Sequence, residues 1–482
     1  MLTLLLILIP TLTATAVLAT KNNSAKQLAL IGAIAELVLA LVLWRQFENN
    51  ATFQFGFNYK WIESLGISFS GGIDGISLLL VILTALLTPL IVLSTFRQPY
   101  KNASAFYALI LFMQAALMGV FTATDAFLFY FFFEVALIPI YFLAAVWGGE
   151  NRIKVTFKFF VYTIFGSLFM LIALVYLYFQ TPSTHSSNIA DFYAVALNAQ
   201  QQGYLFWAFF IAFAIKMPLF PFHTWQPDTY TESPTAATML LAGIMLKMGV
   251  YGLIRFILPI VPLGVQTWGT TATILSVIGI IYGSVIAIQQ RDMKRLIAYS
   301  SFAHVGLMAA GVFSQTLNGV QGALIQMLAH GINVVGLFFI IEIIFSRTKT
   351  RNIEQLGGIT QRAPNLTIYF IILMLGSVAL PLTNGFVGEF LLLSGVYESN
   401  QWLGAISTLT IILSAVYMLR LVQKTMFGQK SNFTEHFADL SFSEKAVLLP
   451  LTIMVFWMGV YPNSFLKITE PAVSNLLKMI QQ

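Results

Sequence analysis

The chain has 482 residues, of which 58% are hydrophobic and only 9% are charged, where a soluble domain has about 25% charged residues. A soluble fold could not bury so much apolar surface, so the composition predicts a polytopic membrane protein. The absence of cysteine excludes disulfides, thiolate catalysis and cysteine-ligated clusters. The net charge of +6 reflects loop topology and does not indicate binding of nucleic acid.

Apolar runs of about 20 residues recur along the chain, and in lipid such runs form helices, which satisfy their own backbone hydrogen bonds. The predicted fold class is therefore an all-α polytopic membrane protein, with a single integral membrane domain over residues 1–482. The first run lacks the basic n-region of a signal peptide, so we interpret it as a retained span. About fourteen transmembrane helices are predicted, at 1–20, 28–45, 73–95, 103–122, 125–147, 155–180, 204–230, 234–258, 268–289, 295–313, 318–346, 365–397, 401–426 and 446–466.

Lysine and arginine are distributed unevenly over the predicted loops. If the N-terminus lies outside, the inner loops carry 18 of the 25 basic residues, and the outer segments carry four. Cytoplasmic loops hold the excess of basic residues in membrane proteins. The bias therefore predicts that both termini lie outside, on the periplasmic side of a bacterial cytoplasmic membrane, and that the number of spans is even.

Several ionisable residues lie inside predicted spans, where a charge costs about 2.5–3.5 kcal/mol and needs a reason. A buried lysine beside a glutamate can switch its protonation state when the glutamate is drawn toward another partner. Histidine titrates near neutral pH and relays protons in either direction. Together these residue types predict a lateral proton path at one depth in the membrane. The six candidates are Glu134, Lys216, Lys247, His304, His330 and Glu389.

Two predicted spans contain helix-breaking residues beside a charge. Pro218 and Pro221 follow Lys216 in "AFAIKMPLFPFHTW", and their missing N–H groups leave upstream carbonyls unpaired. Lipid tolerates this only where protein or water satisfies the carbonyls, so we expect a polar pocket beside Lys216. The stretch "GSVALPLTNGFVGEF" repeats the design, with Pro381 ahead of Glu389.

These broken spans are the seventh and the twelfth, five spans apart. A repeat unit with an odd number of helices must be inverted in the membrane. The pattern predicts two inverted five-helix repeats, roughly 103–258 and 268–427, with flanking helices at 1–95 and 446–466.

Other polar residues have simpler interpretations. We expect Arg255, near a helix end, to extend its charged group to the membrane surface. Glu36, in the peripheral second span, is interpreted as a contact with lipid or a neighbouring subunit. His223 is interpreted as structural. Asp228 and Glu232 lie near the inner surface, where a helix start explains Glu232 about as well as a proton funnel does.

A specific family resemblance begins at "FAIKMPLFPFHTWQPDTYTESPTAATMLLAGIMLKMGVYGLIRF" and continues through "RLIAYSSFAHVGLMAAG", "MLAHGINVVGLFFI" and "TNGFVGEFLLLSGVY". These segments resemble the antiporter-like membrane subunits of proton-pumping NADH–quinone oxidoreductase, respiratory complex I. The resemblance covers about residues 100–430. It implies a loading pair at Glu134 and Lys216, a connecting lysine at Lys247, relay histidines at His304 and His330, and an exit residue at Glu389.

Within that family the chain most resembles subunit M. The L- and N-type subunits usually carry lysine at the position of Glu389, and the L type has a long C-terminal extension, whereas this chain ends at Gln482. The resemblance implies L-like and N-like neighbours, the lateral helix of the L-like subunit and membrane lipid as partners. It also implies that NADH, FMN, iron–sulfur clusters and quinone are bound by other subunits, and that this chain holds no cofactor or metal.

Two other classes of function stay open from the residues alone. A subunit of a multisubunit cation/proton antiporter or of a membrane-bound hydrogenase shares the fold and the lysines, and co-purification with flavin and iron–sulfur subunits would separate these from complex I. A scaffold without transport is disfavoured by the centred charges and the paired helix breaks.

Overall fold

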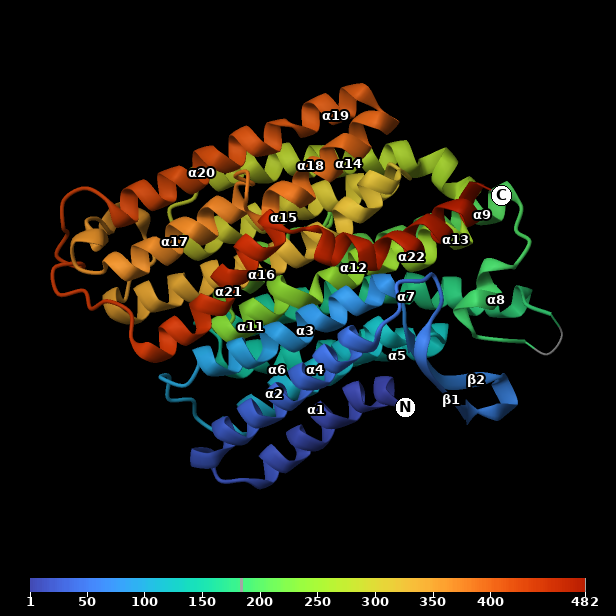
Figure 1. The fold of residues 1–482 in the computed structure, drawn as a ribbon, viewed down its shortest axis with the longest axis horizontal. Helices are drawn as coiled ribbons and strands as arrows, with labels where there is room; N and C mark the ends of the chain where they lie inside the picture. Colours follow the sequence, from blue (N-terminus) through green and yellow to red (C-terminus); the bar gives the residue numbers. More distant parts are fainter. Residues whose placement is uncertain (183–184, 482) are drawn as a thin grey trace. The chain divides into compact units, whose positions relative to one another are not determined.

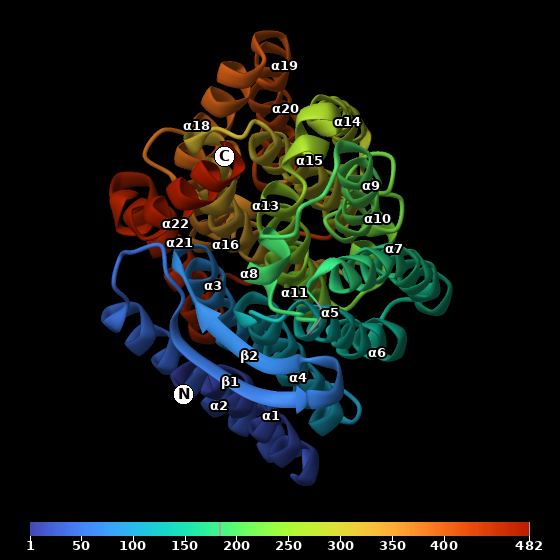
Figure 2. The same ribbon diagram turned by 90° about the vertical axis from the view of Figure 1, so that its right-hand side faces the viewer.

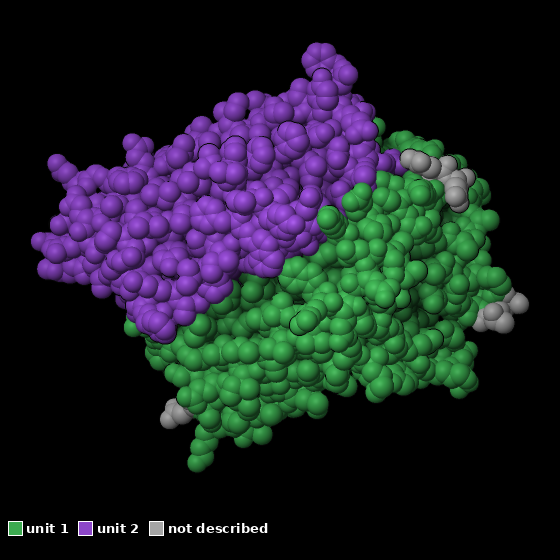
Figure 3. All heavy atoms as spheres, viewed as in Figure 1, with its two compact units in different colours: residues 1–218, 244–272, 467–482 green, residues 219–243, 273–466 purple. Residues whose placement is uncertain are grey.

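The computed structural model describes residues 1–182 and 185–481, which are helical apart from one β-hairpin and the connecting loops (Figures 1 and 2). The chain forms two compact units, coloured green and purple in Figure 3. Unit 1 comprises residues 1–218, 244–272 and 467–482, and unit 2 comprises residues 219–243 and 273–466. The chain therefore passes between the units four times, and the six candidate residues are divided between them.

Unit 1 contains the hairpin and most of the N-terminal helices. In the hairpin, Gln54 lies opposite Ile73 and Tyr59 opposite Phe69. The hydroxyl of Thr3 donates to the carbonyl oxygen of Phe55 at 2.7 Å and so ties the hairpin to the first helix. The elements are α1 (Leu2–Ala19), α2 (Asn22–Gln46), β1 (Gln54–Ile62), β2 (Ile67–Ile73), α3 (Gly75–Ser94), α4 (Ala103–Thr122), α5 (Ala126–Val135), α6 (Leu137–Trp147), α7 (Arg152–Gln180), α8 (Ile189–Tyr193), α9 (Ala199–Lys216), α12 (Lys247–Gly252) and α13 (Leu258–Ile260).

Unit 2 is built around one long helix, α16, which packs against α11, α15, α17, α18 and α21. Its elements are α10 (Gln226–Glu232), α11 (Thr235–Leu240), α15 (Met293–Phe313), α16 (Leu317–Thr348), α17 (Pro364–Ser377), α18 (Asn384–Ser399), α19 (Gln401–Ser407), α20 (Leu409–Met426) and α21 (Phe442–Val460). Two helices, α14 (Pro262–Gln289) and α22 (Asn463–Gln481), belong in part to each unit.

Short polar side chains fix where the helices begin. The carboxylate of Asp74 accepts from the backbone N–H of Ser77 at 2.9 Å, and the Ser77 hydroxyl accepts from the backbone N–H of Asp74. Asn198 and Gln201 make the same reciprocal pair at the start of α9. Such capping boxes satisfy backbone N–H groups that have no partner within the helix. They set the start of α3 and of the helix that ends at Lys216.

Within the described residues, twelve helical stretches are long and apolar enough to cross a membrane. They correspond to twelve of the fourteen predicted spans. The other two are the spans predicted to be broken, at 204–230 and 365–397. In the structure the first is interrupted between Lys216 and Gln226, and its long piece, α9, has 18 residues but begins with polar glutamines. The second is interrupted between Ser377 and Asn384 and forms helices of 14 and 16 residues. The broken helices are confirmed, whereas the number fourteen stays a prediction.

Hydropathy alone missed two elements. The predicted outer loop at about 46–72 contains the hairpin, and the C-terminal residues form the amphipathic helix α22. A search for apolar runs finds spans and does not find strands or helices with one polar face. The two compact units are defined by which residues pack together, and this gives no information about symmetry. The units therefore do not test the inverted repeats, which stay a prediction.

Candidate functional site

Lys216 is the last residue of α9 and is almost fully buried in unit 1. Its Nζ donates to the carbonyl oxygen of Phe133 at 3.4 Å and lies 4.4 Å from the centroid of the Phe133 ring. The helix ends here because Pro218 and Pro221 cannot donate to the carbonyls four residues before them. The break thus leaves a lysine in aromatic surroundings, held by a backbone carbonyl and a ring face.

Glu134 lies next to Phe133 near the end of α5, and its carboxylate acts electrostatically on Lys216. Among the described residues, no direct ion pair joins the two side chains, and the Oε1 atom of Glu134 is buried without a hydrogen-bond partner. The Ser167 hydroxyl on α7 is a hydrogen-bonding neighbour of the carboxylate. The structure therefore brings Glu134 and Lys216 together as neighbours that interact through the electric field.

Lys247 begins α12 and is fully buried, in a helix that contains π-helical turns at 241–245 and 253–257. Such turns often occur at functional sites. Two glycines let α12 approach α9 closely. A Cβ atom added to Gly249 would lie 2.6 Å from the Cβ of Met217, and one added to Gly252 would lie 2.3 Å from the Phe213 ring. Lys247 thus lies on the helix that packs against the broken end of α9.

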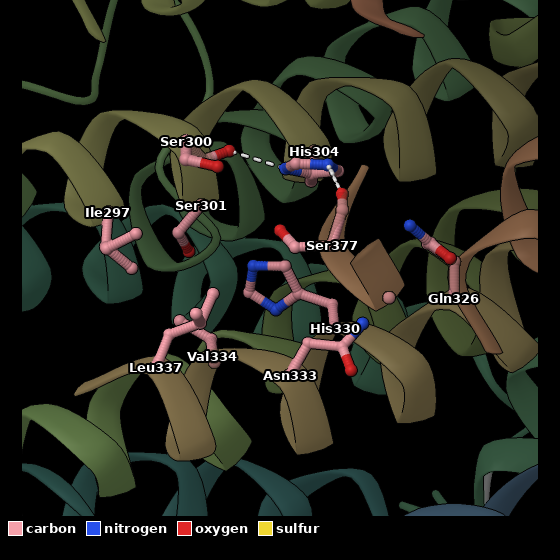
Figure 4. Close-up of a pocket in the computed structure, with 11 residues that line it drawn as sticks. Ile297, Ser300, Ser301, His304, Gln326, His330, Asn333, Val334, Leu337 and Ser377 are labelled. Carbon is pink, nitrogen blue, oxygen red and sulfur yellow. Dashed lines mark hydrogen bonds between the residues drawn. The ribbon is translucent and has the colours of Figure 1, made fainter. Parts of the chain in front are cut away.

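His304 lies on α15 in unit 2 and is held at both ring nitrogens (Figure 4). Its Nδ1 is 2.7 Å from the carbonyl oxygen of Ser300, and its Nε2 is 3.1 Å from the carbonyl oxygen of Ser377. A carbonyl oxygen only accepts, so both ring nitrogens must carry a hydrogen to make these bonds. The geometry therefore fits the positively charged imidazolium form of His304.

The acceptor at Ser377 results from the second helix break. In an unbroken helix its carbonyl would accept from the residue four positions later, which is Pro381, and proline has no N–H group. The carbonyl is therefore available to His304. Here the predicted consequence of the proline, an unsatisfied carbonyl that finds a polar partner, is seen directly.

Glu389 on α18 is also buried and completes this site. Its Oε1 lies 3.2 Å from Nε2 of His304 and accepts from Nε2 of Gln326 at 3.4 Å. A Cβ atom added to Gly388 would lie 2.2 Å from the Gln326 side chain, so this close contact requires glycine. Glu389 and His304 form a direct, buried ion pair, in contrast to the indirect coupling of Glu134 and Lys216.

His330 on α16 faces the same small cavity as His304, and the two ring centroids are 6.0 Å apart. The cavity has a volume of about 10 Å³, close to the space that one water molecule needs. Ser301 and Gln326 also line it, and each presents a buried oxygen that has no hydrogen-bond partner among the described residues (Figure 4). The size and the polar lining suit a water molecule that connects the two histidines.

Two asparagines hold the second helix break in place and were not identified from the sequence. The side-chain amides of Asn333 and Asn384 donate to each other at 3.1 Å. A Cβ atom added to Gly376 would lie 3.0 Å from the oxygen of each amide. The sequence signal was present, because Asn333 follows His330 by three residues and so lies near the same face of α16.

Two sequence interpretations were wrong. The guanidinium of Arg255 is not exposed: it is buried and forms an ion pair with Asp74, the residue that caps α3. Its backbone carbonyl also accepts from the hydroxyl of Tyr193 at 2.9 Å. Glu36 is fully buried within unit 1 and does not face lipid. By contrast, His223 stacks on Phe302 with ring centroids 4.4 Å apart, in agreement with its structural interpretation.

The six candidate residues thus form two groups. Unit 1 holds Glu134, Lys216 and Lys247, and unit 2 holds His304, His330 and Glu389. Among the described residues, no group of three or more histidine, aspartate or glutamate side chains could hold a metal ion. The arrangement can bind and pass protons, since all six side chains are titratable and buried or half-buried.

Comparison with known proteins identifies relatives of the whole chain. The family described as NADH:quinone oxidoreductase/Mrp antiporter, TM, matches residues 123–414. NADH-quinone oxidoreductase subunit M from Rickettsia typhi is 40% identical over 460 residues, which are 95% of this chain and 92% of the relative.

Two solved structures share the fold. A chain of respiratory complex I from Thermus thermophilus with bound NADH is 32% identical, with a TM-score of 0.93 and full coverage of both chains. A chain of the Mrp complex from Dietzia sp. DQ12-45-1b has a TM-score of 0.84 over 100% of this chain and 99% of that one. At 19% identity this second match shows the fold alone.

Proposed function

The chain belongs to the NADH:quinone oxidoreductase/Mrp antiporter transmembrane family, and we propose that it is the proton-translocating M-type membrane subunit of an NADH–quinone oxidoreductase. The relatives that support this proposal match nearly the full length of the chain. In the complex, the subunit uses energy from NADH oxidation and quinone reduction to move protons through the buried groups of units 1 and 2.

The observation that carries the proposal is the hydrogen bonding of His304, whose two ring nitrogens each contact a backbone carbonyl. When its ring gives up a proton, one of the two carbonyls of Ser300 and Ser377 loses its donor in a buried site, at a cost of about 1–3 kcal/mol. The ring therefore regains a proton readily, and Glu389 beside it stabilises the positive charge. A buried group that releases one proton and then takes up another is what a relay requires.

Unit 1 suits a different step of the same process. Lys216 is held by a carbonyl and a ring face and is coupled to Glu134 without a direct ion pair. A lysine in such apolar surroundings binds its proton weakly unless a negative charge is near. A change in the charge of Glu134 therefore changes the proton affinity of Lys216, and this coupling supports a loading role for the pair.

We propose that the redox chemistry lies outside this chain. NADH, FMN, iron–sulfur clusters and quinone are assigned to other subunits, and the neighbours to L-like and N-like membrane subunits, with the lateral helix of the L-like subunit alongside. The second candidate is a subunit of a cation/proton antiporter, which the same family includes and whose fold is similar. The 40% identity with subunit M favours complex I.

Purification of the intact complex separates these candidates. We expect the chain to co-purify with flavin and iron–sulfur subunits and to support NADH-driven proton uptake in proteoliposomes. Lys216→Ala should greatly lower the ratio of protons taken up to NADH oxidised, because it removes a deeply buried titratable group. The control is Lys60→Ala, whose side chain is 75% exposed on the hairpin.

An unchanged ratio in Lys216→Ala, with the complex fully assembled, would contradict the proposal. Isolation with cation-antiporter subunits and without flavin would favour the second candidate. If Lys60→Ala lowered the ratio as strongly, the measurement would report general damage and the assignment of Lys216 would lose its support.

The proposed location is a bacterial cytoplasmic membrane with both termini on the periplasmic side. Because the chain lacks cysteine, a cysteine introduced at Asn188 is unique within it. We expect an impermeant thiol reagent to label Asn188→Cys from the outside only, and Gln429→Cys from the cytoplasmic side only, because both positions are exposed in loops. Labelling with the opposite sidedness would overturn the orientation.

A further inference from the structure

A lysine outside the six candidates is buried at one end of unit 2. Lys294, the second residue of α15, is only 4% exposed. Its Nζ donates to the carbonyl oxygen of Ser233 at 2.5 Å, at the point where α10 ends. A lysine is almost never fully buried unless it is paired or used. Capping the carbonyl of Ser233 is one use, and the charges around Lys294 indicate another.

Carboxylates from three elements surround Lys294. Glu342 on α16, Asp292 ahead of α15 and Glu232 on α10 act on it electrostatically, as does the guanidinium of Arg351. Asp292 is already paired with Arg351 at 3.1 Å, and it also caps α15. Glu342 has the largest electrostatic effect of the three on Lys294, and its side chain is half-exposed. A half-exposed carboxylate thus stands beside a buried amine.

The hydroxyl of Thr235, near the start of α11, donates to the carboxylate of Glu342. Glu342 therefore lies beside both the helix start and the buried lysine. Nearby, Arg295 pairs with Asp228 at 3.0 Å. The carboxylate of Glu342 accepts from Thr235, two residues after the carbonyl to which Lys294 donates, so it lies close to the amine on which it acts.

The same face of α15 leads from Lys294 to the histidine cavity. Ile297, Ser301 and His304 follow Lys294 by three, seven and ten residues, a spacing that places all four on one side of the helix. The last three line the cavity (Figure 4). Seven residues correspond to about 10 Å along the helix axis, so Ser301 lies about two turns from Lys294. Its buried hydroxyl has no hydrogen-bond partner among the described residues.

We propose that Glu342 and Lys294 form a proton-collecting site that supplies the cavity between His304 and His330. The inference rests on the proposed function and adds the side chains through which unit 2 takes up protons. The ammonium of Lys294 releases a proton, through the Ser301 hydroxyl or water, to His330 and becomes a neutral amine. The Glu342 carboxylate takes up a proton from bulk water and passes it to that amine, so both groups return to their starting forms.

Lys294→Arg separates proton transfer from capping. Arginine keeps the positive charge and can still donate to the carbonyl of Ser233, but it does not give up its proton in proteins. We therefore expect the intact complex with this variant to assemble normally and to show a proton-to-NADH ratio lower by about threefold or more. If Lys294 only caps α10, the ratio stays at the parental value, and that result would overturn the inference.

Glu342→Gln tests the outer member of the pair. Glutamine can still accept from Thr235 but does not titrate. Collection of protons becomes limiting as they become scarce, so the ratio should fall by about threefold at about pH 8 and change little at about pH 6.5. The matched control is Glu354→Gln, which removes another carboxylate of unit 2, paired with Lys424 at 2.5 Å. It should change the ratio at neither pH.

The remaining outcomes are distinguishable. An equal loss at both pH values in Glu342→Gln would indicate a structural role and contradict proton collection. Lys216→Ala, measured in parallel, reports on the proposed function itself. If Lys216→Ala lowers the ratio and neither Lys294→Arg nor Glu342→Gln does, the proton-collecting site is wrong and the proposed function stands. If Lys216→Ala leaves the ratio unchanged, the proposed function fails first.

Discussion

Lys216 in unit 1 lies against an aromatic ring, whereas His304 and Glu389 in unit 2 lie among backbone carbonyls and the amide of Gln326. Lys216 makes one long hydrogen bond and contacts one aromatic ring. The carboxylate of Glu134 acts on it electrostatically, without a direct ion pair. His304 has acceptors at both nitrogens and a direct ion pair with Glu389. Coupling through the field varies slowly with distance, and hydrogen bonding is lost beyond about 3.5 Å. Shortening a carboxylate side chain should therefore weaken the pair of Glu389 and His304 more than the pair of Glu134 and Lys216.

The largest effects should come from the two carboxylates. Glu389→Gln removes the negative charge bonded to His304, and a hydrogen bond between charged groups contributes about 1.5–3 kcal/mol, so proton pumping should fall about tenfold or more. Glu389→Asp keeps the charge with a shorter reach and should retain a substantial part of the activity. Glu134→Asp should retain more than Glu389→Asp, because its coupling is not a direct bond.

Turnover-normalised proton uptake in proteoliposomes measures all three variants. Full pumping by Glu389→Gln would show that the charge of Glu389 is not needed for proton transfer. Equal losses in the two aspartate variants would remove the proposed difference between the units.

A second prediction concerns a buried charge that is not a relay. Asp74→Asn leaves Arg255 buried without its counter-charge, and breaking such a pair costs about 3–5 kcal/mol. We expect much less assembled complex and a lower melting temperature, yet an unchanged proton-to-NADH ratio in the fraction that assembles. Asp191→Asn, at an exposed position in α8, is the control for loss of an aspartate. A specific loss of pumping in Asp74→Asn would place the pair on the proton path.

A smaller effect is expected from Gly388→Ala. Its methyl group would lie 2.2 Å from the oxygen of Gln326, which must move and release Glu389. The loss of one such hydrogen bond, about 1 kcal/mol, predicts a two- to fivefold decrease in pumping. Gly203→Ala, where the nearest atom would be 3.6 Å away, should pump normally. Parental pumping by Gly388→Ala would show that Gln326 does not support the pair of His304 and Glu389.

The smallest effect should come from a surface charge. The hydrogen bond from Lys424, with the one from Arg420, holds the pKa of Glu354 below its usual range. A carboxylate with a lowered pKa adds stability that is complete above its unfolded pKa and is lost as the pH falls through its folded pKa. The melting temperature of Glu354→Gln should therefore be slightly lower than that of the parent at neutral pH, and the difference should vanish in acid. A difference that grew in acid would contradict the pairing.

The sequence predicted the parts of the site that depend on local chemistry. Prolines predicted both helix breaks. Pro381 alone explains why the carbonyl of Ser377 has no partner within its helix and is available to His304. Pairings between distant segments were not predictable, because hydropathy and spacing carry no information about which helices touch. Arg255 and Asp74 are 181 residues apart, and their pairing depends on the packing of α3 beside the π-helical turn at 253–257. The hairpin at 54–73 was missed for another reason, because a search for apolar runs does not find strands.

A double variant tests whether both groups of buried residues serve one proton path. Residues that act as a unit show effects that do not add. The proton-to-NADH ratio of the intact complex should be measured in proteoliposomes for Lys216→Ala, Glu389→Gln and the combination. If the path is single, the double variant pumps no less than the more damaged single variant. A double variant whose loss equals the product of the two single losses would contradict a single path and indicate two independent routes.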